Sequence, residues 1–201
     1  MKNNIKIFLL TVSILFSGCT VITPSKSEYI ITPTITVEKA DESSCKEQTI
    51  KIAQAFSDTS LMSRKMKYTY DEQQEFTYSE SIWSRAPSRA ISSVLLASIR
   101  DSELFKSVNS YKSRSRSDLI LETNIEEFIQ HYNDENRESF VKVVISFSLI
   151  NSKTSKTIDN KTIMVEIEAE SLNAQGGVKA LNKALSEILQ KNNKWLRSIC
   201  K

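Results

Sequence analysis

The sequence predicts a single α+β domain, a mainly antiparallel sheet with two helices packed on one face. Segments with apolar residues at every second position indicate strands, and two segments with the helical period indicate amphipathic helices. Short polar links join the last three predicted strands, which suits antiparallel neighbours. The order of strands, helix, strands and helix is typical of an α+β sandwich.

The first strands are expected at 48–56, 65–71 and 75–83. The last two form a hairpin, because only a short polar link at 71–74 separates them. Alternation places Met66, Tyr68 and Tyr70 on one face of the hairpin, and Tyr78 follows on its second strand. Trp83 ends that strand just before the first helix.

The first helix is expected from Pro87, which suits a first turn, to about Ser102. Strands are expected at 117–130, 140–150 and 161–170. The second helix is expected to begin after Gly176-Gly177, with an apolar face that includes Trp195.

The aromatic residues of the hairpin have two interpretations. Tyr68, Tyr70 and Tyr78, together with Phe76, form either core beneath a helix or a surface for a partner or an acyl chain. Trp83 is expected to be a packing residue at the corner between strand and helix.

A search for catalytic chemistry finds no candidate residues. His131 is the only histidine and falls in the polar stretch "IQHYNDEN", where we expect a solvated loop residue. No serine lies in a nucleophile elbow, no spacing of ligands indicates a metal, and no phosphate-binding loop is present. We therefore expect a protein that is not an enzyme and needs no cofactor.

The N-terminus has the layout of a signal peptide at residues 1–18. Lys2 and Lys6 precede an apolar run of about ten residues, whereas a membrane-spanning helix needs roughly twenty. Removing this segment takes away two lysines and no acid, so the net charge falls from +3 to +1. A nearly neutral mature chain has no nucleic-acid signature.

The stretch "LFSGCT" around Cys19 resembles a bacterial lipobox, in which the cysteine is lipidated, with acyl chains such as palmitate, and becomes the mature N-terminus. It departs from the usual pattern in having Phe16 in place of leucine three residues before the cysteine. More than one acyl chain gives stable membrane anchoring. The residue after Cys19 is Thr20, whereas an aspartate at this position commonly retains such proteins at the inner membrane. The absence of that aspartate favours the periplasmic face of the outer membrane. The alternative is a secreted protein with a chance cysteine at the cleavage site.

Residues 19–44 are interpreted as the lipidated N-terminus and a tether, in which Tyr29 to Val37 is extended and docks at a sheet edge. The domain follows at 45–201. Cys45 and Cys200 are expected to form a disulfide, because a cysteine pair in an oxidising periplasm is more often a disulfide than a metal site.

The chain resembles the ABC-type transport auxiliary lipoproteins of the paraquat-inducible protein C type. The resemblance lies in the order of features rather than in any one motif: Cys19, Tyr29, Tyr68, Tyr70, Trp83, Pro87, the stretch "SSVLLASIRDSELF" and Trp195-Leu196. It implies a non-enzymatic part in phospholipid transport, with a mammalian-cell-entry (MCE) domain protein and an ABC permease as partners. The lipoprotein, alone or as a ring of identical copies, would dock the MCE conduit to the outer membrane. The alternative is an envelope lipoprotein that binds a cell-wall enzyme or stabilises the outer membrane.

Overall fold

The structure, a computed structural model, describes residues 25–40, 42–70, 74–133 and 138–201. Cys19, Thr20 and the signal peptide at 1–18 lie outside these residues. Within them, no helix is long and apolar enough to cross a membrane.

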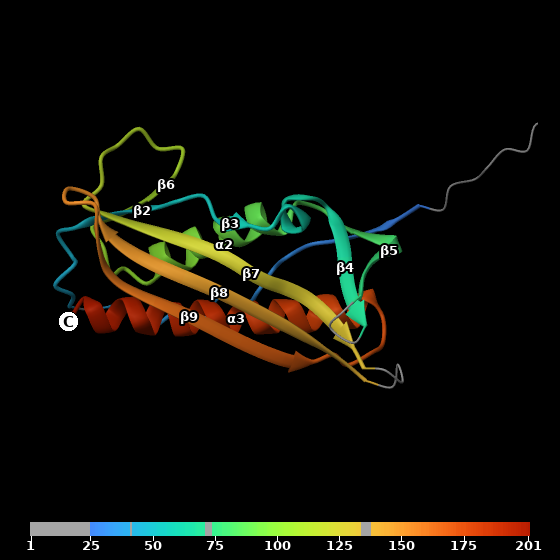
Figure 1. Cartoon of the computed structure of the whole chain (residues 1–201). Helices are drawn as coiled ribbons and strands as arrows, with labels where there is room; N and C mark the ends of the chain where they lie inside the picture. Colours follow the sequence, from blue (N-terminus) through green and yellow to red (C-terminus); the bar gives the residue numbers. More distant parts are fainter. Residues whose placement is uncertain (1–24, 41, 71–73, 134–137) are drawn as a thin grey trace, which may run out of the picture.

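The described chain is an α+β domain with one mixed sheet of nine strands and two long helices, which confirms the predicted fold class (Figure 1). Both helices cover the same face of the sheet. The elements are β1 (Ser27–Tyr29), β2 (Thr49–Ile52), β3 (Phe56–Ser57), the short 3-10 helix η1 (Thr59–Met62), β4 (Lys65–Tyr70), β5 (Gln74–Trp83), α2 (Pro87–Asp101), β6 (Ser107–Ser110), β7 (Leu119–Tyr132), β8 (Ser139–Asn151), β9 (Lys156–Glu168) and α3 (Ala174–Ile199).

Strand β7 is the centre of the sheet. One side of β7 pairs with β8 along its whole length, and β8 pairs in turn with β9; both ladders are antiparallel, as is the β4–β5 hairpin. The other side of β7 pairs with β2, β3 and β4 in succession, and all three pairings are parallel. The parallel pairings arise because the chain returns to the sheet through α2 before it forms β7, and parallel neighbours require such a crossover.

A β-bulge at Glu126 changes which residues of β7 face the helices. Ile125 pairs with Ile145, and Glu127 pairs with Val144, so Glu126 is the extra residue. Before the bulge the odd-numbered residues are buried beneath the helices. After it the inward residues are Phe128, Gln130 and Tyr132.

Helix α2 begins at Pro87 as predicted, and Ile91, Leu95 and Ile99 of its apolar stripe are buried. Helix α3 begins at Ala174, so the predicted start after Gly176-Gly177 is wrong. The reason is that Asn173 caps the helix, its side chain accepting a hydrogen bond of 2.9 Å from the Gly176 amide. The two glycines therefore lie in the first turn of α3 rather than before it.

Residues 30–40, which we call the strap, run along α3 to the C-terminal end of α2. The side-chain oxygen of Asn182 in α3 accepts a 2.6 Å hydrogen bond from the Thr32 amide, and Ile31 is buried. At the far end the Ala40 amide donates to the Ser102 carbonyl over 3.0 Å. Of the segment Tyr29 to Val37 that was expected to dock at a sheet edge, only Tyr29 does so, as the last residue of β1, and the rest lies against α3 instead. The segment expected to be a tether is thus held on the domain from Ser27 onward.

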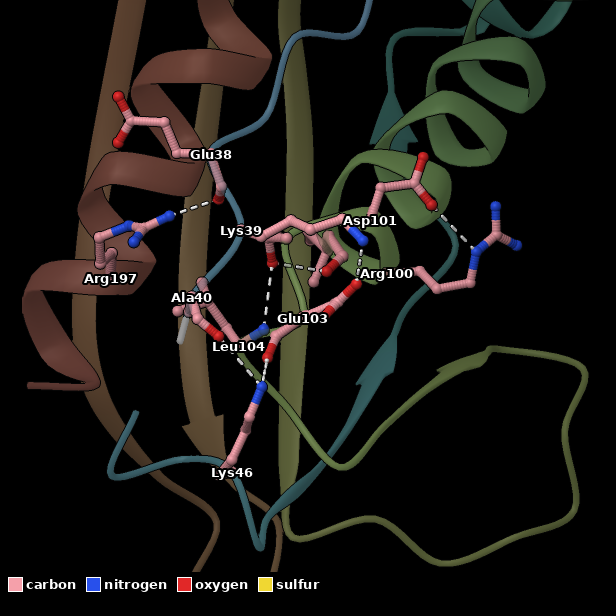
Figure 2. Close-up of polar contacts among 11 residues, drawn as sticks. Glu38, Lys39, Ala40, Lys46, Arg100, Asp101, Glu103, Leu104 and Arg197 are labelled. Atoms are coloured by element: carbon pink, nitrogen blue, oxygen red, sulfur yellow. Dashed lines mark hydrogen bonds and ion pairs between the residues drawn. The ribbon is translucent and has the colours of Figure 1, made fainter. Parts of the chain in front are cut away.

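Figure 2 shows how polar contacts fix the end of the strap. The Lys46 ammonium donates to the carbonyls of Ala40, at 3.1 Å, and of Glu103, at 2.8 Å. Arg197 of α3 donates to the Glu38 carbonyl from the other side. The strap is thus held between the C-terminal ends of the two helices.

A disulfide closes the same end of the molecule. The structure contains the expected bond between Cys45 and Cys200, whose Cα atoms are 5.3 Å apart. Both cysteines are buried, and the Ser44 amide donates to the Cys200 carbonyl over 3.1 Å. The bond therefore joins the residues just after the strap to the end of α3.

Candidate interaction surface

Five aromatic side chains gather on the helix-covered side of the sheet, at the end where α3 begins. They come from β4 (Tyr68, Tyr70), β5 (Phe76, Tyr78) and β7 (Tyr132), and we call them the aromatic surface. Strand register brings them together, because Tyr68 pairs with Phe76 across the hairpin and Tyr70 pairs with Tyr132. The Tyr68 ring lies at the centre, with its centroid 4.5 Å from that of Tyr78 and 5.6 Å from that of Phe76.

The inner edge of the aromatic surface is a closed hydrogen-bond network. Gln130 accepts a 2.9 Å hydrogen bond from the Tyr78 hydroxyl and donates over 3.0 Å to the Ser139 hydroxyl. The hydroxyls of Tyr78 and Tyr132 are 2.6 Å apart. Burial and the hydrogen bond with Tyr132 raise the pKa of the Tyr78 hydroxyl, so it stays protonated and remains a donor.

Helix α3 contacts this network through a residue without a side chain. A Cβ atom added to Gly177 would lie 1.9 Å from the side-chain oxygen of Gln130. Glycine is therefore required for the first turn of α3 to approach the network so closely. Gln130, held by three elements, fixes the inner edge of the aromatic surface.

The outer edge of the aromatic surface is open to solvent. Phe76 is 39% exposed, and Tyr132 is buried, with only 7% of its surface exposed. Tyr68, Tyr70 and Tyr78 are partly buried. Both interpretations of the aromatic residues therefore apply in part: the inner edge is packed, and the outer edge presents rings to the surroundings. Exposed Phe76, with the partly exposed tyrosine rings beside it, makes this edge a candidate interaction site.

Trp83 lies apart from the aromatic surface. Its side chain is 4% exposed, and its ring centroid lies 5.9 Å from that of Phe128 beneath the helix layer. This position at the corner between β5 and α2 is that of a packing residue, which is the interpretation favoured by the sequence.

The expectation that His131 is a solvated loop residue is wrong. His131 lies in β7, is 6% exposed and stacks on Phe140 with the ring centroids 4.9 Å apart. Its two ring nitrogens lie 2.7 Å from the Thr69 hydroxyl and 2.7 Å from the Glu127 carboxylate. The expectation fails because β7 continues past Gln130 to Tyr132, and because the bulge turns His131 onto the face opposite the helices.

The Thr69, His131 and Glu127 row has the atom types of a nucleophile, a base and an orienting acid, but its setting is structural. Thr69 and His131 are direct partners in the β4–β7 ladder, and the buried imidazole is stacked against Phe140, which leaves a substrate little access to it. Burial raises the pKa of Glu127, but hydrogen bonds from His131 and Lys142 outweigh this effect and hold it below its ordinary value. The row ties the hairpin to the centre of the sheet. Among the residues that the structure describes, no three His, Cys, Asp or Glu side chains are grouped to hold a metal ion.

Comparisons with solved structures define the fold. No family model matches the sequence, and no curated protein matches it. A Xanthomonas campestris protein described by the family model DUF330 superposes with a TM-score of 0.75 at 15% identity, over 86% of this chain and 95% of that one. An uncharacterized protein superposes with a TM-score of 0.65 at 13% identity, over 86% of this chain and 99% of the other.

These two likenesses show that the chain has the same α+β fold over nearly its whole described length. At such low identities they show the fold alone. A minor lipoprotein from Acinetobacter baumannii, with 8% identity over 76% of this chain and 94% of that one, reaches a TM-score of only 0.43, too low to carry an argument.

Proposed function

We propose that the chain is a lipoprotein of the bacterial envelope, held on the periplasmic face of the outer membrane by lipid on Cys19. Its function is that of a non-enzymatic auxiliary component of an ABC/MCE-type phospholipid transport system, in which it docks the MCE conduit to the outer membrane. The resemblance of the sequence to the transport auxiliary lipoproteins supports the proposal. The fold shared with the DUF330 protein is compatible with it.

The observation that carries the proposal is the docked N-terminal segment. Strand β1 adds to the sheet edge beside β5, the strap is hydrogen-bonded to both helices, and the disulfide fastens the chain to the end of α3 just beyond it. Only residues 20–26 then separate the lipidated cysteine from the folded domain. A domain joined so directly to its anchor is suited to holding a partner at a fixed height above the membrane.

Purification from the native envelope tests this function. The lipidated protein is extracted in mild detergent, and mass spectrometry identifies the proteins recovered with it. We expect an MCE-domain protein together with its permease, and we expect a Cys19→Ser variant to be lost from the outer-membrane fraction. Recovery of cell-wall enzymes without an MCE protein would favour the alternative function and contradict this one.

A further inference from the structure

The open edge of the aromatic surface lies at the end of the molecule where the chain from Cys19 joins the sheet. Ser27 of β1 pairs with Ser81 of β5, and Phe76 lies five residues from Ser81 along the same strand. At the rise of an extended strand this separation is about 17 Å. The aromatic surface and the entry of the chain therefore share one end of the sheet.

The chain before β1 is long enough for the aromatic surface to touch the membrane that holds Cys19. Seven residues lie between Cys19 and Ser27, and the eight residue-to-residue steps, fully extended, span at most about 28 Å. This reach exceeds the distance along β5 from Ser81, which pairs with Ser27, to Phe76. The other end of the sheet is farther away, because the 14 residues of β7 from Leu119 to Tyr132 span about 43 Å.

The chemistry of this edge suits the interface between lipid and water. Tyrosine rings combine an apolar body with a hydroxyl and are enriched at the level of the lipid headgroups. Lys67 and Glu75 lie on the opposite face of the hairpin, where they form an ion pair, and Arg64 pairs with Glu28 over 2.6 Å near β1. Pairing lowers the cost of bringing these charges close to lipid.

We propose that the aromatic surface is a membrane-contact site, which lies against the headgroup layer of the bilayer in which Cys19 is anchored. The lipid on Cys19 brings the domain to the membrane, and the rings of Tyr70 and Phe76 fix its orientation. The opposite end of the sheet, with β6 and the β8–β9 turn, then points away from the bilayer toward the periplasm. This inference rests on the lipid anchor of the proposed function.

Fluorescence quenching by lipid tests the contact in the full-length lipidated protein. A Phe76→Trp variant places a reporter at the open edge, and a Tyr70→Trp variant provides a second reporter should the first fail to fold. Tyr111, 42% exposed near the opposite end of the sheet, provides the matched control as Tyr111→Trp. Trp83 and Trp195 are buried and contribute the same background to every variant. Each protein is reconstituted in phosphatidylcholine vesicles with bromine atoms on the upper part of the acyl chains.

The proposal predicts a loss of emission from the Phe76→Trp reporter, a shift of that emission to shorter wavelength, and neither effect for Tyr111→Trp. Equal quenching of both reporters, or quenching of neither in protein that floats with the vesicles, would overturn the membrane contact and leave the anchor intact. Shielding of the Phe76→Trp reporter only when a purified protein partner is added would assign the surface to that partner instead. Failure of the protein to float with vesicles at all would count against the lipid anchor, and so against the proposed function.

Discussion

Deleting a single residue from β7 should be almost harmless at Glu126 and severe four residues earlier. Without Glu126 the strand becomes regular, with Ile125 still facing the helices and Phe128 still inward. The deletion removes the bulge and the hydrogen bond that the Ser146 hydroxyl donates to the Glu126 carboxylate. An exposed hydrogen bond of this kind contributes about 1 kcal/mol, so the deletion should cost no more than that.

Deletion of Glu122 should be strongly destabilising. The residues on one side of the deletion shift by one position, so their side chains move to the other face of the sheet. If the strand after the bulge keeps its register, residues 123–126 shift by one position and the bulge is lost. Ile125, which is 1% exposed, then faces solvent, and Glu126 faces the core. Losing a buried isoleucine costs about 2 to 5 kcal/mol. Placing a carboxylate in the core adds several kcal/mol. The sum, more than about 5 kcal/mol, reaches the lower end of the total stability of a typical domain.

Urea denaturation of the two deletion variants, with near-ultraviolet circular dichroism to follow the tyrosine cluster, measures this difference. The midpoint should fall slightly when Glu126 is removed, and the tyrosine signal should persist. Removal of Glu122 should abolish cooperative unfolding or lower the midpoint severely. Equal destabilisation by the two deletions would refute the conclusion that the bulge sets the faces of β7.

Three further substitutions test the packing around the site. Replacing both Cys45 and Cys200 by alanine opens a loop with a sequence separation of 155 residues and should cost up to about 5 kcal/mol of unfolding free energy; an unchanged urea midpoint in non-reducing buffer would contradict this. Trp83→Ala should cost about 3 to 5 kcal/mol in thermal or urea unfolding, and an unaltered midpoint with lost partner binding would make Trp83 a contact residue. Gly177→Ala should cost about 1 to 3 kcal/mol because its methyl group meets Gln130, whereas the same substitution at exposed Gln175 should leave the midpoint unchanged.

Periodic apolar patterns predict most elements of this fold. The hairpin, α2 and the three long strands are found where alternation or the helical period places them, because apolar side chains recur along one face of each. The cysteine pair was also predictable, since an extracytoplasmic setting favours a disulfide. The parallel pairing of β2, β3 and β4 with β7 was not, because these pairings depend on how distant segments meet.

The aromatic surface was predicted only in part. Alternation in the hairpin placed Tyr68, Tyr70 and Tyr78 together, but Tyr132 and Gln130 were missed because the bulge interrupts the alternation of β7. Two adjacent carboxylates at Glu126 and Glu127, followed by a renewed apolar pattern, were the only signal of that change. The position of the strap had no such signal, because its contacts with the helices are mostly made by backbone groups.

The most direct test of the central claim is the intact mass of the protein purified from its native membrane. Lipid anchoring predicts a mature chain that begins at Cys19 and carries two or three acyl chains, with Cys45 and Cys200 oxidised. An unmodified N-terminus at any other residue would contradict the anchor, and with it the account of how the domain is held at the outer membrane.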